Sequence, residues 1–139
     1  MVQIRILGLL SLFLLLFAGS CRAQETSPKK AEKSPVYKQG IASYYADKFQ
    51  GRRMANGKLY DHNKLTAASN QFSLGTWVEV RNLANRKSVI VQITDRMHPK
   101  NKRLIDLSKS AAQRLGFIKK GITKVRVEKV KKPGSPPKS

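Results

Sequence analysis

Two apolar runs joined by a polar turn make up the stretch Trp77-Val-Glu-Val-Arg-Asn-Leu-Ala-Asn-Arg-Lys-Ser-Val-Ile-Val-Gln-Ile93. Apolar and charged side chains alternate in the first run, residues 77–81, as they do in a strand buried on one face. The second run, residues 87–93, is richer in apolar residues and is expected nearer the centre of a sheet. Residues 82–86 supply the turn, so the stretch predicts a β-hairpin.

Further signals on the C-terminal side complete a mainly β pattern. Residues 124–128 alternate again and are expected to form a closing strand. One helix is predicted, with Ser108 as its N-cap, residues 109–115 as its body and Gly116 just past its end. Its small apolar face consists of Ala111, Ala112 and Leu115. Short strands with a single small helix favour a compact barrel over an open sheet.

Seven short motifs follow one another in a fixed order within residues 40–130. They are Gly40-Ile-Ala-Ser-Tyr44-Tyr45, Ala55-Asn-Gly57, Tyr60-Asp61, Leu65-Thr-Ala-Ala68, Leu74-Gly-Thr76, Thr94-Asp95-Arg96 and Ile105-Asp-Leu-Ser108. This series resembles the RlpA (rare lipoprotein A) family of bacterial cell-wall proteins. The resemblance implies that residues 40–130 form a six-stranded double-psi β-barrel with one or two short helices.

The same resemblance implies an endolytic peptidoglycan lytic transglycosylase. Such enzymes cut the β-1,4 bond between N-acetylmuramic acid (MurNAc) and N-acetylglucosamine (GlcNAc) and leave a 1,6-anhydro product. One carboxyl group can act first as acid and then as base, whereas ordinary glycoside hydrolases use two. Asp95 is the candidate, because it follows the apolar residues 89–93 and matches the aspartate of the family's Asp-Arg-Gly-Pro segment. Its alternative role is to cap a turn or to pair with Arg96 or another cation.

Other residues are expected to line the substrate groove, because they match family motifs or neighbour Asp95. They are Asp61, Ser69, Tyr44, Tyr45, Lys58 and Arg96. Asp61 is equally compatible with a turn-forming role, and Asp106 is interpreted as structural because it precedes the helix. Trp77 fits a core position as well as a groove position. Neither a metal site nor a cofactor is predicted, since the two histidines have uninformative spacing and no acidic cluster occurs.

Three departures from the family pattern favour an alternative function. Lys58 replaces a glutamate, Ser69 replaces a histidine, and Met97-His98-Pro99 replaces a Gly-Pro pair. His98 or His62 could supply an imidazole instead, or could simply be exposed polar surface. The alternative is therefore a non-catalytic barrel that binds peptidoglycan or another glycan without cutting it. A third possibility is a basic surface that contacts a partner and has no glycan site.

The N-terminal residues 1–23 have the layout of a secretory signal. Arg5 precedes an apolar run that ends in small residues just before Cys21, the only cysteine. The sequence before Cys21 resembles a lipobox, so we expect acylation there and attachment to a membrane. Conventional cleavage after Ala23 would instead leave a soluble periplasmic protein. Both alternatives predict export, to the periplasm or to the outer membrane.

The remaining segments and the charge define the expected partners. Residues 24–39 are polar and are expected to form a flexible linker, and residues 131–139 a disordered basic tail. Residues 40–130 contain 19 Lys and Arg against 6 Asp and Glu, which leaves +13. Such a surface attracts polyanions. Export argues against nucleic acid and favours the carboxylates of peptidoglycan, so we expect a monomer that contacts glycan strands.

Overall fold

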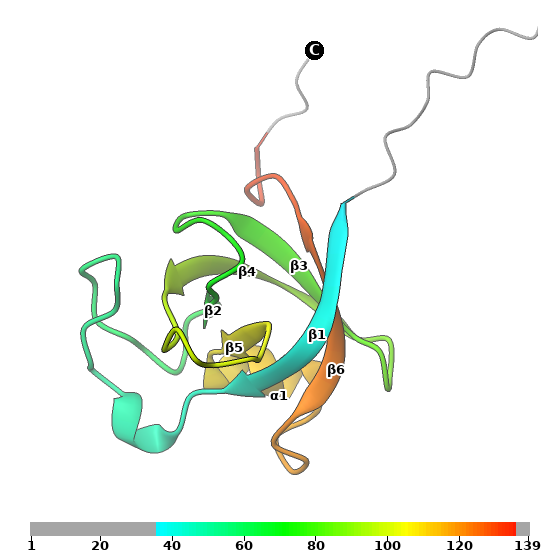
Figure 1. Ribbon diagram of the computed structural model, residues 1–139, viewed down its shortest axis with the longest axis horizontal. Helices are drawn as coiled ribbons and strands as arrows, with labels where there is room; N and C mark the ends of the chain where they lie inside the picture. Colours follow the sequence, from blue (N-terminus) through cyan, green and yellow to red (C-terminus); the bar gives the residue numbers. More distant parts are fainter. Residues whose placement is uncertain (1–35, 136–139) are drawn as a thin grey trace, which may run out of the picture. The chain divides into compact units, whose positions relative to one another are not determined.

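Six strands form one closed barrel in the computed structural model, which describes residues 36–135 (Figure 1). Around the barrel the order is β1-β5-β2-β4-β3-β6. The strands are β1 (Tyr37–Tyr44), β2 (Thr66–Ala68), β3 (Trp77–Asn82), β4 (Ser88–Asp95), β5 (Ile105–Leu107) and β6 (Thr123–Lys129). A 3-10 turn, η1 (Asp47–Phe49), and one α-helix, α1 (Lys109–Leu115), complete it. The mainly β barrel with short helices is therefore confirmed.

The predicted hairpin is present as β3 and β4. The two strands pair antiparallel from Trp77 opposite Gln92 to Arg81 opposite Ser88. Their alternate valines are buried in the barrel, as the alternation predicted. At the turn, the Asn82 N–H donates to the Lys87 carbonyl at 2.8 Å. The Asn82 amide also donates to the carbonyl of Leu115 at 2.9 Å, which ties the hairpin to the helix end.

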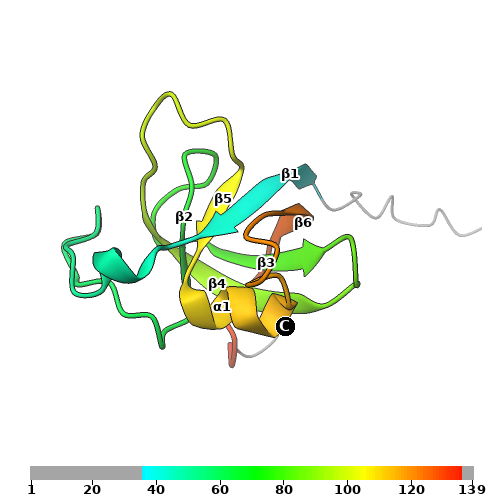
Figure 2. The ribbon, with the colours of Figure 1, turned by 90° about the horizontal axis from the view of Figure 1, so that it is seen from below.

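The helix begins and ends where the sequence predicted. The Ser108 hydroxyl accepts a hydrogen bond from the Ala111 N–H, and Gly116 ends the helix with φ of 74°. That left-handed conformation is open to glycine without a steric cost. The buried face of α1 consists of Ala111, Ala112 and Leu115. Figure 2 shows α1 running alongside β4, which closes this side of the core.

The first strand begins inside the segment that was expected to be a flexible linker. Residues 37–39 belong to β1, which pairs antiparallel with β6 from Tyr37 opposite Glu128 to Ala42 opposite Thr123. The side chains of these residues are exposed, so their sequence shows no apolar face. Backbone pairing with β6 holds the strand, and the Arg126 guanidinium lies 4.0 Å from the centre of the Tyr37 ring.

The two shortest strands, β2 and β5, place the candidate site. Strand β2 pairs parallel with β4 and antiparallel with β5. Ala68, in β2, therefore lies opposite Asp95 on one side and Asp106 on the other. The two acidic residues are thus neighbours across a single intervening strand, although eleven positions separate them in the sequence.

Several sequence predictions lie outside the described residues. These are the signal segment, the alternatives at Cys21 and Ala23, and most of the linker. Lys131–Ser135 continue beyond β6 without helix or strand. Neither helix within residues 36–135 is long and apolar enough to cross a membrane.

Candidate active site: a groove around Asp95

Asp95 is the last residue of β4, at the point where this buried strand leaves the barrel. Its Oδ1 accepts hydrogen bonds from the backbone N–H groups of Ala55 and Arg96, both at 2.8 Å. Its Oδ2 accepts a hydrogen bond from the Tyr45 hydroxyl at 2.7 Å. Within residues 36–135 no salt bridge involves this carboxylate, so it does not pair with Arg96. All three donors are uncharged.

Tyr45 is a fixed donor to this carboxylate. Burial of its hydroxyl raises the pKa of Tyr45 far above its ordinary value, and the hydrogen bond to Asp95 and the charge of that group raise it further. The phenol therefore keeps its proton at any physiological pH. Its ring lies 4.3 Å from the Tyr60 ring, between centroids, and packs edge-on against Phe49. Tyr45 thereby holds one oxygen of Asp95 in place.

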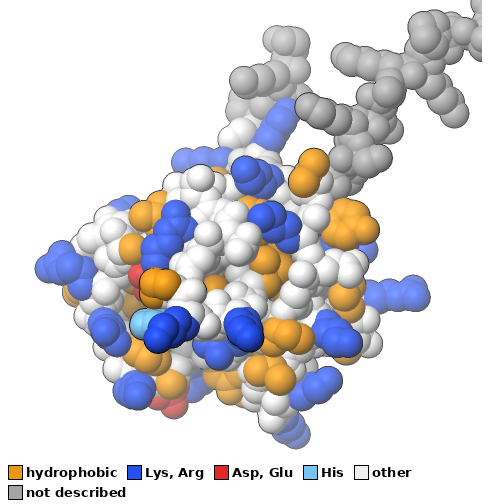
Figure 3. Space-filling view, in the orientation of Figure 1, with side chains coloured by type: hydrophobic (Ala, Val, Ile, Leu, Met, Phe, Trp, Pro, Cys, Tyr) orange, Lys and Arg blue, Asp and Glu red, His pale blue; other side chains and the backbone are white. Residues whose placement is uncertain are grey.

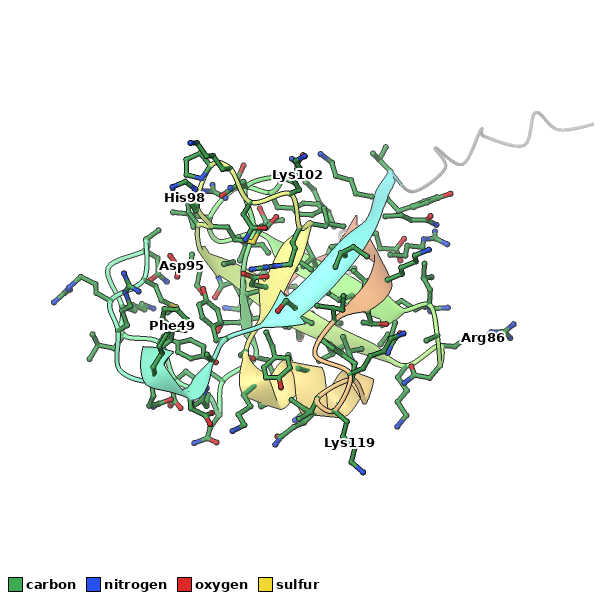
Figure 4. The ribbon with its side chains drawn as sticks, turned by 60° about the horizontal axis from the view of Figure 1, so that its bottom comes forward. Phe49, Arg86, Asp95, His98, Lys102 and Lys119 are labelled. Atoms are coloured by element: carbon green, nitrogen blue, oxygen red, sulfur yellow. The ribbon has the colours of Figure 1, made fainter. Side chains whose placement is uncertain are left out.

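A groove of about 570 Å³ surrounds this pair. Tyr45, Asp95 and Asp106 contribute to its lining together with two loops that leave the barrel (Figure 4). The first loop follows η1 and the second joins β4 to β5. Figure 4 shows Asp95 between Phe49, the last residue of η1, and His98 of the second loop. The lining residues are Tyr44, Tyr45, Ala46, Phe49, Arg52, Arg53, Met54, Tyr60, Ala68, Asp95, Arg96, Met97, His98, Asn101, Arg103 and Asp106.

The first loop is docked on the end of β4. The N–H of Asn56 donates to the Thr94 carbonyl at 3.2 Å, next to the bond from Ala55 to Asp95. The loop folds back at Gly57, whose φ of 83° lies in the left-handed region that glycine tolerates. This turn brings Met54, which is 7% exposed, against the β4 end. The position of Asp95 therefore depends on the Ala-Asn-Gly motif found in the sequence.

Asp106 is the second carboxylate of the groove, and it has a cationic partner. The Arg103 guanidinium donates from Nε to Oδ1 at 2.8 Å and from Nη2 to Oδ2 at 2.9 Å. A two-point pair of this kind fixes both side chains more firmly than a single contact does. The sequence interpretation of Asp106 as structural did not anticipate that it lines the groove. The available signals were the motif that contains Asp106 and the spacing of three residues between Arg103 and Asp106.

Two of the residues predicted to line the groove, Arg96 and Tyr44, do line it and also make contacts that support the fold. The Arg96 guanidinium donates to the backbone carbonyls of Ser69 and Phe72, which braces the loop that follows β2. Tyr44 packs edge-on against Phe117 and donates its hydroxyl to the Ile118 carbonyl at 3.0 Å. The Arg96 guanidinium and the Tyr44 hydroxyl therefore donate to backbone carbonyls of the fold and not to Asp95. Tyr45 is therefore the tyrosine of the pair that reaches Asp95.

Ser69 does not line the groove, and the expectation that it does is wrong. The residue is 0% exposed. Its hydroxyl donates to the Leu104 carbonyl at 2.8 Å and accepts from the Gln71 N–H at 3.1 Å. Both capacities of the hydroxyl are thus used within the fold. The side chain is buried because the loop after β2 passes under the segment that leads into β5.

Lys58 and Asp61 also lie outside the groove lining. Lys58 is exposed in the turn after Gly57, where its backbone N–H donates to the Asn56 side chain at 3.0 Å. The Asp61 Oδ1 accepts from the Asn63 N–H at 2.9 Å, which is an Asx-type turn. The turn-forming alternative for Asp61 is therefore the one that the structure shows.

Of the remaining aromatic and imidazole candidates, only His98 lines the groove, whereas Trp77 and His62 lie elsewhere. Trp77 is half-buried in a separate hollow of about 780 Å³ over the outer side of β3 and β4, together with Glu79. His62 lies outside the groove, with Nδ1 hydrogen-bonded to the Tyr60 hydroxyl at 2.8 Å. His98 lines the groove. No group of three or more His, Cys, Asp or Glu residues within 36–135 could hold a metal ion.

Comparison with curated proteins finds RlpA proteins of several bacteria among the similar sequences. The endolytic peptidoglycan transglycosylase RlpA of Haemophilus influenzae is 42% identical over 110 residues, which cover 78% of this chain and 38% of that protein. The protein of the same name from Pseudomonas aeruginosa is 46% identical over 89 residues, 64% of this chain and 26% of its own length. The chain therefore spans less than half the length of these curated relatives.

Solved structures share the barrel. The Streptomyces papain inhibitor superposes with a TM-score of 0.57 at 22% identity, over 69% of this chain and 96% of that chain. An expansin from Clavibacter michiganensis gives 0.57 at 26% identity, over 73% and 54% of the two chains. The model of the family described as "Lytic transglycolase" matches residues 37–127. With most of its length matched, the chain belongs to the lytic transglycolase family of double-psi β-barrels, as its resemblance to the RlpA proteins predicted.

Proposed function

We propose that this protein is an endolytic peptidoglycan lytic transglycosylase that cleaves the MurNAc–GlcNAc β-1,4 bond with Asp95 as the acid and base. The observation that carries the proposal is the environment of Asp95. Of the two carboxylates that line the groove, it is the one held by three uncharged donors and free of any salt bridge within residues 36–135. The relatives that are 42–46% identical carry the name of this activity.

The proposed reaction uses one carboxyl group twice, first to give a proton and then to take a different one. Protonated Asp95 gives its proton to the glycosidic oxygen as the bond to the MurNAc anomeric carbon breaks. The C6 hydroxyl of the same MurNAc attacks that carbon, and the Asp95 carboxylate accepts the hydroxyl proton. The acid is thereby regenerated, and the products are a 1,6-anhydro-MurNAc end and a free GlcNAc hydroxyl. Positioned proton transfer of this kind contributes about 10² to 10⁴ in rate.

Tyr45 supports this reaction without exchanging a proton itself. Since its pKa is raised by burial, its hydroxyl remains a donor to Asp95 Oδ2. The two backbone N–H groups that contact Oδ1 restrict the carboxylate further. A group held in this way presents its free lone pairs in one direction, which lowers the entropic cost of reaching the reacting geometry.

Glycan binding without cleavage is a second candidate function. It is favoured by the positions of two residues at which the sequence departs from the family pattern. Ser69 is fully buried and Lys58 does not line the groove, so neither assists Asp95. The other groove carboxylate, Asp106, is occupied by Arg103. In a binding protein the groove would hold the same glycan, with Asp95 as a hydrogen-bond acceptor.

Digestion of purified peptidoglycan distinguishes the two functions. The native protein is incubated with intact sacculi and with peptide-free glycan strands, and the soluble products are analysed by mass spectrometry. We expect 1,6-anhydromuropeptides or anhydro-sugars that a protein-free control lacks. Retention of the protein on sacculi without any anhydro product would contradict the enzyme and support the binding barrel.

The basic surface is proposed to assist contact with the wall. Figure 3 shows Lys and Arg side chains spread over the face that it displays, with few acidic groups. The stem peptides of peptidoglycan carry carboxylates that such a surface attracts. Exposed charges are screened over about 8 Å at physiological salt. Retention on sacculi should therefore fall between low and high salt, and unchanged retention at roughly 1 M salt would assign binding to groove contacts alone.

We further propose that the protein is exported and acylated at Cys21, since an apolar segment ending in Ala-Gly-Ser precedes this cysteine. The intact mass of the membrane-fraction protein should correspond to a lipid-modified chain that begins at Cys21. A soluble chain that begins at Gln24 would show cleavage after Ala23 instead. One acyl chain binds a membrane only marginally, and the basic surface would strengthen attachment to anionic lipid.

A further inference from the structure

The loop between β4 and β5 presents an imidazole to the groove. His98 contributes to the lining that contains Asp95, and Figure 4 shows its side chain on this loop above the Asp95 position. His62, the other histidine, lies outside the groove, with Nδ1 bonded to Tyr60 and Nε2 buried 3.6 Å from an Asp47 oxygen. The two imidazoles therefore have different surroundings, and His98 alone is open to a groove ligand.

The backbone around His98 is braced. The Met97 N–H donates to the Asn70 Oδ1 at 3.0 Å, and the Asn70 amide donates to the His98 carbonyl at 3.4 Å. The Asn101 N–H donates to the same carbonyl at 2.9 Å. Met97 anchors the loop beneath, at 8% exposure. Bonds to Asn70 of another loop and to Asn101 of the same loop hold the main chain at His98 in one conformation, which favours a fixed direction for its side chain.

The ring itself is oriented by a local hydrogen bond. The Lys100 N–H donates to His98 Nδ1 at 3.2 Å. A nitrogen that accepts a hydrogen bond carries no proton in the neutral ring, so the proton of neutral His98 resides on Nε2. His98 Nε2 makes no hydrogen bond to any residue within 36–135. The ring thus offers one N–H donor that the fold does not use.

We infer that His98 is a substrate-binding residue, whose Nε2–H donates to an oxygen of the glycan seated beside Asp95. This inference rests on the proposed function, because it takes glycan as the ligand of the groove, whether that glycan is cut or only bound. These sugars present hydroxyl and acetamido oxygens around the edge of the ring, and a fixed N–H donor can select one of them. With Phe49 on the opposite side of Asp95, the groove then holds a strand between an aromatic ring and a hydrogen-bond donor.

Three variants of the full chain test the inference. His98→Ala removes the donor, and His98→Gln replaces it with an amide N–H of similar reach. Lys102→Ala is the matched control, because Lys102 is exposed on the same loop and is absent from the groove lining. Each variant is measured for KM and kcat on peptide-free glycan strands, for retention on sacculi and for thermal unfolding.

We expect His98→Ala to weaken glycan binding and raise KM by about three- to tenfold, the equivalent of one hydrogen bond. His98→Gln should recover part of this loss, and Lys102→Ala should match the parent in KM on peptide-free glycan strands. Unfolding temperatures should be nearly the same for all three, since His98 is exposed and its side-chain hydrogen bond is to Lys100 of its own loop. Equal binding and KM in parent and His98→Ala would overturn the inference.

Failure of the proposed function gives a different pattern. If the parent binds glycan but releases no anhydro product, the transglycosylase is excluded, and His98 is judged by glycan retention alone. If the parent releases anhydro products and His98→Ala does so with unchanged KM, the enzyme stands and the inference about His98 is wrong. A parent that neither binds nor cuts glycan would remove both.

Discussion

Strands β4 and β5 each place a carboxylate in the same groove, and the two carboxylates have different surroundings. Asp95, at the end of β4, accepts hydrogen bonds from a phenol and two backbone N–H groups. Asp106, in β5, accepts a hydrogen bond from the Arg103 guanidinium on each of its two oxygens. Both lie opposite the same residue, Ala68. The difference shows that position in the barrel does not by itself determine what a carboxylate can do. The hydrogen-bonding partners of each carboxylate distinguish the two.

An ion pair and a set of neutral donors have different consequences. The Arg103 guanidinium brings a positive charge to Asp106 and donates to both of its carboxylate oxygens. The donors to Asp95 bring no net charge, so a substrate can contact this carboxylate without breaking an ion pair. This difference supports the proposal that Asp95 transfers the proton and that Asp106 has a structural or substrate-contacting role.

The largest expected effect tests the first half of the comparison. Asp95→Asn keeps the shape and the acceptor for backbone N–H groups but removes the ability to give or take a proton. Release of anhydro products should fall by about 10² to 10⁴, with retention on sacculi unchanged. Mass spectrometry of digests over a time course measures this loss. Full activity in the variant would exclude Asp95 as the acid and base.

Removing the phenol hydroxyl beside Asp95 should have the next largest effect. Tyr45→Phe keeps the ring packed between Tyr60 and Phe49 but deletes the hydrogen bond to Asp95. A hydrogen bond to a charged group is worth roughly 1.5 to 3 kcal/mol. We expect kcat to fall by about tenfold, because only part of that energy aligns the carboxylate in the reaction. An unchanged kcat would show that the backbone donors position Asp95 without Tyr45.

The same hydroxyl gives a prediction for alkaline pH. Folding raises the pKa of Tyr45 above its unfolded value of about 10. The stability from keeping this phenol protonated is complete below that value and is lost as pH rises above it. Urea denaturation at about pH 8 and pH 11 should therefore show a smaller loss of stability in Tyr45→Phe than in the parent. An equal loss in both proteins would contradict the buried hydrogen bond.

The second half of the comparison concerns Asp106. Asp106→Asn keeps one acceptor for Arg103 but removes the negative charge. Because Arg103 is partly exposed, the stability cost should be about 1 kcal/mol or less. Activity should fall by less than about tenfold, since Asp106 is not assigned the proton transfer. A loss as large as that of Asp95→Asn would show instead that two carboxylates share the chemistry, as in ordinary glycoside hydrolases.

The smallest effect is expected at Asp61, which provides a matched carboxylate outside the groove. Asp61→Asn retains the oxygen that accepts from Asn63, so its turn should persist. We expect activity within about twofold of the parent and stability within about 0.5 kcal/mol. Digestion assays run beside those of Asp95→Asn and Asp106→Asn provide the measurement. A strong loss of activity would return Asp61 to the substrate groove.

Local signals in the sequence predicted the elements that depend on neighbours in the chain. Ser108 and Gly116 bound the helix because a hydroxyl cap and a left-handed glycine act within a few residues. The hairpin followed from alternation and turn composition. By contrast, β2 and β5 have three residues each and are strands only through pairing with distant segments. Residues 37–39 were missed for the same reason, because β6 supplies their hydrogen bonds.

The site was predicted in part, for a related reason. Motif matching placed Asp95, Tyr45 and Arg96 at one location, and the structure brings all three together. It could not show that Ser69 points into the fold, since a single serine gives no sign of the direction of its side chain. The partners that distinguish Asp95 from Asp106 also escaped it, because Tyr45 lies fifty positions from Asp95.

The antiparallel seam between β1 and β6 makes the barrel a candidate for circular permutation. Tyr37 lies opposite Glu128, so a short hairpin turn could join the end of β6 to the start of β1. New termini could be opened at the exposed residues Lys119 and Lys120. Every residue of the Asp95 groove falls between positions 44 and 106, so neither change interrupts this stretch of the chain, although Tyr44 contacts Phe117 and Ile118 beside the new termini. Chain connectivity at the seam and chemistry in the groove are therefore separable, and a rearranged chain should assemble the same groove.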